Sequence, residues 1–495
     1  MERFSGILMP IFSLPSKYGI GSFSKEAYKF ILWLKDAGQS YWQILPTGPT
    51  GFGDSPYQSF SVFAGNLYFI DPEELIEEGV LTKRECEAAL CGDEGRIDYG
   101  KLYKTRYQLL MTAFERSNAG NDCEYIAFVR DNSFWLDDYA LFMACKEHFG
   151  GKEFTLWDED IKNREKNAME KYSEKLSEKI AFHKYVQYKF FSAWNRLKAF
   201  ANANGIKIIG DIPIYTAADS CDVWADRRFF DVDENGVPNI VAGCPPDGFS
   251  ADGQLWGNPV YKWDEHRKDG YSWWIKRLRH CFMMYDVVRI DHFRGFDEFY
   301  TIPNGETTAK NGKWKKGPGK ELFDAFRDSC GKKEIIAEDL GFVTPSVKKL
   351  VADCGFSGMK VLQFGFDSRD GGGGDYLPHN YKYSCAAYTG THDNPTLAGW
   401  IKEITADERE QLHTYLCDYS TPDDRLNFPL IGLVMRSRAK YVIIPIQDWL
   451  ELGNEARINA PATLGGNWTW RVDSDMLSKE LAEKILHTTR IYGRI

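Results

Sequence analysis

The chain lacks the cysteine patterns of a metal-stabilised protein. Its 495 residues include 11 cysteines, but none forms a Cys-x-x-Cys pair or combines with histidine at the spacing typical of zinc ligands. Single cysteines scattered along a long chain are typical of the reducing cytosol. We therefore expect no metal site and a cytoplasmic location.

The chain also lacks a membrane span, an excess of positive charge and a nucleotide-binding loop. No stretch approaches the roughly 20 apolar residues that cross a bilayer, and the N-terminus shows no small-residue cleavage site. Asp and Glu outnumber Lys and Arg by 71 to 61, and the net charge of −10 argues against a nucleic-acid partner. The run Gly371–Gly374 is expected to be a flexible loop, since it lacks the strand–GxGxxG–helix setting of a phosphate-binding loop. The basic stretch Lys310–Lys320 is expected to be a solvated loop.

Aromatic residues, in contrast, are abundant. They make up 15% of the chain, with 15 Trp, 26 Tyr and 32 Phe. One interpretation is a large aromatic core. The other is a carbohydrate-binding cleft, because the flat apolar faces of sugars stack on aromatic rings.

Eight short apolar segments alternate with helical patterns along the chain. Buried parallel strands are runs of this kind. Helical patterns lie between them, for example Ser24–Ala37, which ends at Gly38, and Tyr185–Asn204, which ends at Gly205. This alternation predicts an α/β protein with a closed (β/α)8 TIM barrel. The predicted strands are Gly6–Met9, Tyr41–Leu45, Ile206–Ile209, Asp286–Ile290, Ile335–Ala337, Met359–Phe364, Cys385–Thr389 and Tyr441–Ile446.

Uneven spacing of these strands predicts two inserted subdomains within a single catalytic barrel spanning residues 1–495. The second and third strands are much further apart than one helix requires, and residues 73–180 are rich in Lys, Glu and other helix formers. We expect a mainly helical subdomain there. A second insertion, at about 216–274, is crowded with Trp, Pro, Gly and Asp.

Three of the predicted strands lead into a polar cluster that contains a carboxylate. The segments VVRIDHFRGF (287–296), IIAEDLGF (335–342) and YTGTHDNP (388–395) place Asp291, Glu338 and Asp393 near strand ends. In a (β/α)8 barrel the carboxyl ends of the strands converge on one face, so these side chains can meet in one pocket. Cleavage of a glycosidic bond needs such a set, with one carboxylate as nucleophile and one as general acid.

The first two clusters also have structural interpretations. Arg289 and Asp291 point the same way on a strand, where the arginine would lower the pKa of the carboxyl and keep it ionised, but they could form a purely structural ion pair. Glu338 follows an apolar wall, which would raise its pKa and hold a proton for a leaving oxygen. Alternatively, Glu338 and Asp339 could open the next helix.

The third cluster is open to the same two interpretations. His392 and Asp393 could hydrogen-bond to sugar hydroxyls. Alternatively, Asp393 or Asn394 could cap a helix that starts at Pro395.

Taken together, these segments resemble glycoside hydrolase family 77, the 4-α-glucanotransferases of the alpha-amylase-like clan. The resemblance covers essentially the whole chain, with seven blocks in the family's order. They are GFGDSPYQSFSVFAGN (51–66), GDIPIY (210–215), GQLWGNPVY (253–261), RIDHFRGF (289–296), AEDLG (337–341), THDNP (391–395) and RINAPATLGGNWTWR (457–471). One departure is Ala462, where the family commonly has glycine. Alanine is a poor substitute there only if the position needs a positive φ.

The resemblance implies a role for each carboxylate and for several neighbours. Asp291 would be the nucleophile, Glu338 the general acid/base, and Asp393 the residue that binds ring hydroxyls and stabilises the transition state. Tyr57 would stack under the reacting sugar, and Trp256 would lie in a loop folded over the glucan-binding cleft. The full set of implied substrate-binding residues is Ser55, Tyr57, Asp211, Trp256, Arg289 and His392.

The implied activity is transfer of part of an α-1,4-glucan to the 4-position of an acceptor glucan or glucose, with retention of configuration. Expected partners are maltooligosaccharides and other α-1,4-glucans, with glucose as an acceptor; we expect no cofactor, nucleic acid or membrane. The two reacting carboxyl groups should lie about 5–5.5 Å apart. An α-glucan hydrolase of the same mechanism remains an alternative, because spacing does not reveal whether water or sugar captures the intermediate.

Two alternatives of other classes follow from the same residues. The first is a metal-assisted hydrolase with Asp291, His292, His392 and Asp393 as ligands. The second is a non-catalytic glucan-binding protein.

Overall fold

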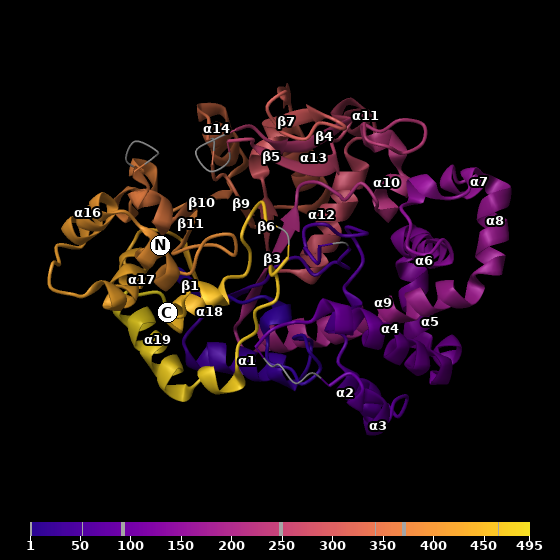
Figure 1. Ribbon diagram of the computed structural model, residues 1–495, viewed down its shortest axis with the longest axis horizontal. Helices are drawn as coiled ribbons and strands as arrows, with labels where there is room; N and C mark the ends of the chain where they lie inside the picture. The colour runs from indigo at the N-terminus through magenta and orange to yellow at the C-terminus, as the bar shows by residue number, and fades with distance from the viewer. Residues whose placement is uncertain are drawn as a thin grey trace.

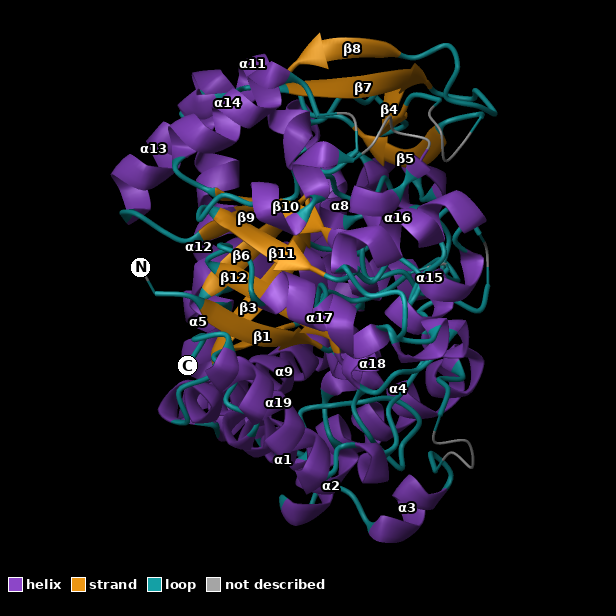
Figure 2. Ribbon diagram, turned by 90° about the vertical axis from the view of Figure 1, so that its left-hand side faces the viewer, coloured by secondary structure: helices purple, strands orange, loops and turns teal. Residues whose placement is uncertain are grey.

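The computed structural model contains a closed barrel of eight parallel strands, surrounded by helices, and a separate four-stranded sheet (Figures 1 and 2). It describes residues 2–51, 53–90, 95–246, 251–341, 343–368, 373–463 and 465–495. Around the barrel the strand order is β1-β12-β11-β10-β9-β6-β3-β2. The barrel strands are β1 (Phe4–Leu8), β2 (Tyr41–Gln43), β3 (Lys207–Pro213), β6 (Val287–Asp291), β9 (Ile335–Ala337), β10 (Ser357–Val361), β11 (Cys385–Tyr388) and β12 (Tyr441–Pro445).

All eight predicted strand segments are therefore confirmed; the fifth has the predicted bounds, and the ends of the others shift by up to four residues. The third strand runs four residues beyond its predicted end, to Pro213, and the sixth ends three residues early because the chain turns into a 3-10 helix at Leu362–Phe366. Gly371 and Gly372, from the run expected to form a loop, lie outside the described residues.

The barrel is stabilised by apolar side chains on both faces of its strands. One buried cluster includes Leu8, Ile209, Ile336 and Ile443, while their neighbours Ile7, Ile208, Ile335 and Ile444 belong to the larger core. Successive side chains on a strand point to opposite faces, so one set fills the barrel and the other packs against the helices. Full burial of each such side chain contributes roughly 1.5–3 kcal/mol.

Helices lie around the barrel and in the insertions. The predicted helix Ser24–Ala37 is α1, which Ser24 caps by accepting a hydrogen bond from the backbone N–H of Glu26. The helices are α1 (Lys25–Asp36), α2 (Pro72–Glu77), α3 (Lys83–Glu87), α4 (Tyr99–Arg116), α5 (Cys123–Asp131), α6 (Ser133–His148), α7 (Glu159–Lys162), α8 (Lys166–Lys175), α9 (Ser177–Ala203), α10 (Cys221–Ala225), α11 (Trp263–Lys268), α12 (Ser272–Met284), α13 (Lys320–Cys330), α14 (Pro345–Cys354), α15 (Leu397–Glu403), α16 (Ala406–Leu416), α17 (Asn427–Met435), α18 (Ile446–Trp449) and α19 (Lys479–Ile491). In Figure 1, α4 to α8 lie together to one side of the barrel.

The second sheet lies at one end of the molecule (Figure 2). Its order is β5-β4-β7-β8, from β4 (Ile240–Cys244), β5 (Gln254–Pro259), β7 (Glu298–Pro303) and β8 (Lys313–Lys316). Two of these strands come from the segment after β6, outside the predicted insertion at 216–274. The expectation of a loop at Lys310–Lys320 was also wrong, because part of it forms edge strand β8. Lysines on an edge strand discourage pairing with another sheet.

Candidate active site

The three carboxylates predicted from the sequence lie at or beyond the carboxyl ends of barrel strands. Asp291 is the last residue of β6, Glu338 follows β9 directly, and Asp393 lies between β11 and α15. β6 and β9 are neighbours, with Ile290 opposite Ala337. Asp291 and Glu338 therefore leave adjacent strands at the same level of the barrel.

A buried chain of polar groups supports Asp291. Arg289 Nη2 lies 3.0 Å from Asp291 Oδ1, and Arg289 Nη1 donates to the two carboxylate oxygens of Asp211, at 2.7 and 2.6 Å. Asp211, on β3, also accepts a hydrogen bond of 2.8 Å from the Tyr57 hydroxyl. The side chains of Arg289 and Asp211 are only 3% and 0% exposed. The ion pair considered as a structural alternative is therefore present, and it also fixes the orientation of Asp291.

The pKa of Asp291 is raised to about 6, although the sequence led us to expect a lowered value. Burial raises it most; Arg289 lowers it by less, and the charges of Asp211 and Asp393 raise it again. The expectation took account of the arginine but not of the partial burial of the carboxyl group. At neutral pH Asp291 is still largely ionised, which is the state required of a nucleophile.

Glu338 lies in an environment that keeps it protonated. Its Oε2 accepts a hydrogen bond of 2.7 Å from the backbone N–H of His292, and Oε1 accepts one of 2.8 Å from the N–H of Leu340. Burial, followed by the charge of Asp291, raises the pKa of Glu338 to about 8 despite these bonds. The pKa of Glu338 is therefore raised, as the apolar residues before Glu338 predicted.

Glu338 and Asp339 do not open a helix, which was the alternative interpretation. The next helix, α14, begins at Pro345 and is capped by Thr344. The carboxylate of Asp339 accepts a hydrogen bond of 2.7 Å from the N–H of Met359 on β10. The two adjacent acids thus have separate partners, and only Glu338 binds the backbone that follows Asp291.

Asp393 is held by groups from a distant segment. Asn459 Nδ2 donates to Asp393 Oδ1 at 2.6 Å, and Arg457 Nη2 donates to the Asp393 carbonyl at 2.6 Å. The other carboxylate oxygen lies 3.3 Å from His392 Nε2. The interpretation of Asp393 or Asn394 as a helix cap was wrong: α15 starts at Leu397, and Thr396 caps it.

Aromatic rings form a wall next to these groups. The rings of Tyr57 and His392 stack with centroids 5.2 Å apart at 16°, and Trp468 lies 5.8 Å from Tyr57 and 5.9 Å from His392. The Ser55 hydroxyl accepts a hydrogen bond of 3.3 Å from the N–H of Tyr57. Rings from distant parts of the chain thus pack together beside Asp393, with His392 and Trp468 buried and Tyr57 half-buried.

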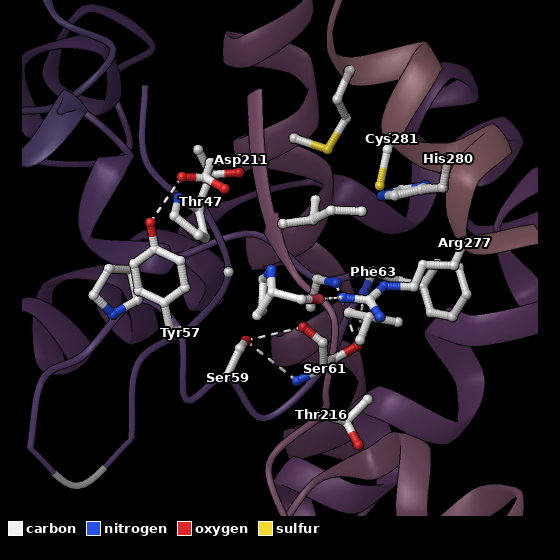
Figure 3. A pocket seen from close by; sticks show the side chains of 18 of the residues that line it. Thr47, Tyr57, Ser59, Ser61, Phe63, Asp211, Thr216, Arg277, His280 and Cys281 are labelled. Atoms are coloured by element: carbon white, nitrogen blue, oxygen red, sulfur yellow. Dashed lines mark hydrogen bonds between the residues drawn. The ribbon is translucent and has the colours of Figure 1, made fainter. Parts of the chain in front are cut away.

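A small cavity of about 50 Å³ borders Tyr57 and Asp211 (Figure 3). Its lining also includes Thr216, Arg277 and His280. The Tyr57 ring is held beside this cavity by the hydrogen bond to Asp211 and by its contacts with the rings of His392 and Trp468.

Trp256 lies on a strand and not in the expected loop. Its strand, β5, is at the edge of the second sheet, next to β4. The indole meets the ring of His292 edge to face, with centroids 4.7 Å apart at 86°. The Trp256 carbonyl accepts a hydrogen bond of 3.3 Å from Gln58 Nε2, one residue from Tyr57. The second sheet therefore contacts the side chain of His292, the residue next to Asp291.

The buried carboxylate of Asp448 fixes both ends of the segment that carries His392 and Asp393. Asp448, in α18, accepts hydrogen bonds of 2.5 Å from the Thr389 hydroxyl and 2.7 Å from the Leu397 N–H. It is 1% exposed, and burial raises its pKa to about 6. The segment between Thr389 and Leu397 is thereby tied to the chain that follows β12.

Comparison with known proteins identifies the family. The model for glycoside hydrolase family 77, the 4-alpha-glucanotransferases, matches residues 9–477. The chain belongs to this family. A 4-alpha-glucanotransferase from Clostridium butyricum is 47% identical over 492 residues, covering 98% of this chain and 100% of that protein. One from Thermus thermophilus is 44% identical, covering 97% of each. The solved structure of an amylomaltase from Streptococcus agalactiae in complex with acarbose has a TM-score of 0.95 at 40% identity, covering 100% of both chains.

Family membership confirms the resemblance read from the seven blocks and favours the transferase over the hydrolase alternative. It agrees with the barrel of eight parallel strands. In the described part of the chain, no group of three or more His, Cys, Asp or Glu side chains is arranged to hold a metal ion, and no helix has both the length and the apolar composition to cross a membrane.

Sequence reasoning missed four residues that contact the site. Arg457, Asn459 and Trp468 lie in the quoted block RINAPATLGGNWTWR, from which we had taken no site residue. Asp448 comes two residues after the predicted eighth strand, so its place near a strand end was an available signal.

The departure at Ala462 falls on a position with a positive φ. Ala462 has φ of +62°, the left-handed region that favours glycine. The condition under which alanine is a poor substitute is therefore met. The residue is exposed, and the strain is local to the segment between Asn459 and Trp468.

Proposed function

We propose that Asp291 is the nucleophile, Glu338 the general acid/base and Asp393 the transition-state stabiliser of 4-α-glucan transfer. The observation that carries the proposal is the different setting of two carboxyl groups at neighbouring strand ends: Asp291 lies 3.0 Å from the Arg289 guanidinium, and Glu338 accepts hydrogen bonds from backbone N–H groups. At pH 7 Asp291, with a pKa of about 6, is ionised, and Glu338, with a pKa of about 8, holds a proton. A retaining mechanism needs both states at once.

In the first half of the reaction, a carboxylate oxygen of Asp291 attacks the anomeric carbon of the donor glucan. The bond from that carbon to the glycosidic oxygen breaks, and the Glu338 proton moves to this oxygen, so the leaving glucan departs with a free 4-hydroxyl. The donor fragment stays attached to Asp291 as a glycosyl ester. Glu338 is then ionised.

In the second half, the 4-hydroxyl of an acceptor glucan or glucose attacks the same carbon. Its proton returns to Glu338, the ester bond breaks, and the electron pair returns to the Asp291 carboxylate. Two inversions leave the α configuration unchanged, and both side chains return to their starting states. A separation of about 5–5.5 Å between the two carboxyl groups remains a prediction of this mechanism.

The remaining predicted residues are proposed to hold the donor. The stacked rings of Tyr57 and His392 would support the reacting sugar, and the partly exposed carboxylate of Asp393 would bind its hydroxyls. Arg289 and Asp211 would act by holding Asp291 and Tyr57 in place. Ser55 would act on Tyr57 through the hydrogen bond between them, and Trp256 would cover the acceptor side.

The substrates we propose are maltooligosaccharides and longer α-1,4-glucans, with glucose as an acceptor. Support comes from the family and from the aromatic wall beside Asp393. We also propose that the protein acts in the cytoplasm without a cofactor, since the side chains of the site suffice for the chemistry. The scattered cysteines are consistent with that compartment.

Incubation with pure maltotriose tests the proposal. We expect glucose together with a ladder of maltooligosaccharides longer than the substrate, separated by chromatography. Products limited to glucose and maltose would replace transfer with hydrolysis.

Substitution of the nucleophile tests its assignment. Asp291→Asn should abolish turnover and leave folding and glucan binding largely intact, because an amide cannot form the glycosyl ester. Wild-type turnover in a folded Asp291→Asn variant would overturn the assignment.

A further inference from the structure

His292 has a strained backbone that orients a carboxyl group. Its φ is +51°, in the left-handed region that costs a residue other than glycine roughly 1–2 kcal/mol. In this conformation its N–H donates to Glu338 Oε2 at 2.7 Å, and the next N–H, of Phe293, donates to the Glu338 carbonyl at 3.0 Å. Strain of this kind persists only where surrounding contacts impose it.

The side chain of His292 is held by two aromatic residues, Trp256 on β5 and Tyr215 after β3. Its ring meets Trp256 edge to face at 4.7 Å and lies 6.4 Å from the ring of Tyr215. The buried Nε2 atom has no hydrogen-bond partner among the described residues. Burial, with a smaller effect of Arg294, lowers the pKa of this imidazole to about 3, so it packs as a neutral ring. Packing against Trp256 therefore sets the position of the ring.

Trp256 lies where its strand pairs irregularly. In the pairing of β4 with β5, Gly243 is opposite Leu255, but Val241 is opposite Pro259, and the register shifts between them. Such bulges loosen a ladder and redirect side chains, often beside active sites. Gly257, with φ of +75°, directly follows Trp256. The regular pairing of β5 with β4 is therefore interrupted at the residue that packs on His292.

We propose that His292 is a positioning residue that transmits the position of Trp256 to Glu338. The side chain of His292 contacts edge strand β5, and the backbone N–H of His292 binds the carboxylate of Glu338, which gives up and takes back the proton. A glucan that moves Trp256 would move the His292 ring and, with it, the N–H that orients Glu338. The inference rests on the proposed acid/base role of Glu338.

The test compares two donors that differ in their need for acid. A glucan leaving group must be protonated, whereas fluoride leaves without a proton. His292→Asn retains a residue that tolerates the left-handed conformation but removes the aromatic contact. We expect it to lower kcat/KM for maltotriose by about tenfold or more, since small displacements of catalytic groups are costly. First-turnover release of fluoride from an α-glucosyl fluoride should fall much less.

A double substitution tests the route through Trp256. If Trp256 holds the His292 ring in place, Trp256→Ala already releases the ring. Adding His292→Asn to that variant should then lower kcat/KM for maltotriose by less than about a further twofold. Tyr215→Phe is the matched control: it keeps a ring near His292 and removes a buried hydroxyl that has no partner among the described residues. We expect wild-type donor preference in this control.

Two outcomes would overturn the inference. One is that His292→Asn loses activity equally on both donors. The other is that the effects of His292→Asn and Trp256→Ala on kcat/KM for maltotriose are fully additive. Glu338→Gln separates these results from failure of the proposed function. If Glu338→Gln loses activity equally on both donors, the acid assignment fails; if it is donor-selective and His292→Asn is not, only the role of His292 fails.

Discussion

Replacement of Asp211 by Asn should move the acid limb of the pH profile to lower pH. Activity needs Asp291 ionised and Glu338 protonated, so kcat/KM should fall below a pH of about 6 and above about 8. The charge of Asp211 raises the pKa of Asp291 from the other side of Arg289. Without that charge, Asp291 should stay ionised to lower pH, while the alkaline limb should change little.

The size of the shift follows from Coulomb's law. Two unit charges on either side of a guanidinium group, roughly 7 Å apart, interact by roughly 2 kcal/mol at an effective dielectric constant of about 20. That energy corresponds to about 1.5 pKa units. The Asp291 side chain is 28% exposed, and solvent screening should reduce the shift to about one unit. The acid limb should therefore move from about 6 to about 5.

The same substitution should destabilise the fold. Asn can accept one hydrogen bond from Tyr57 or Arg289, but its amide faces a guanidinium N–H that then has no acceptor. An unsatisfied buried donor costs about 1–3 kcal/mol, and Asp291 remains as a partner for Arg289, so we expect a loss in this range. Urea denaturation measures it, and initial rates on maltotriose between pH 4.5 and 9 give the profile.

Asp222→Asn is the matched control. Asp222 is also a buried carboxylate, but it accepts a hydrogen bond from the N–H of Val62, far along the chain from Arg289. We expect its acid limb to stay near pH 6. If the acid limb of the Asp211→Asn profile is unchanged or moves to higher pH, the electrostatic account of Asp291 is refuted.

Three further predictions concern other parts of the molecule. Glu338→Gln should lower kcat on maltotriose by about 10²–10⁴-fold and the first-turnover release of fluoride from a glycosyl fluoride much less; equal losses would direct attention to Asp339. Trp256→Ala should shift products from transfer toward hydrolysis and shorter chains, and an unchanged product ratio would leave the residue a packing role only. Ala462→Gly should stabilise the protein by about 0.5–1 kcal/mol in urea denaturation, because relief of left-handed strain exceeds the extra entropy of glycine in the unfolded chain; a loss of stability would contradict this.

The sequence predicted the barrel well because its strands are buried on both faces. Runs such as IIA before Glu338 and YVII before Pro445 are apolar regardless of which strand lies beside them. The same property located Asp291 and Glu338, since a carboxylate directly after an apolar run lies at a strand end. A run of residues does not show which other strand it will pair with. For that reason β5 was taken for a loop, and β7 and β8 were not foreseen.

Contacts between distant segments account for the remaining errors at the site. The pKa of Asp291 depends on Asp211 and on burial beneath other segments, neither of which is visible in VVRID. Asn459 reaches Asp393 across 66 positions of sequence. Each side chain is an ordinary polar residue in its own segment, and only the folded arrangement shows its partner.

The two hydrogen bonds of Asp448 restrict the length of the segment that they bracket. Thr389 and Leu397 must present their donors to opposite oxygens of one carboxylate, so the number of residues between them is fixed by geometry. Side chains within the segment can change without breaking either bond. An inserted or deleted residue would pull one donor away and leave a buried carboxylate oxygen unpaired. Redesign of the donor site at His392 and Asp393 therefore has to proceed by substitution at constant loop length.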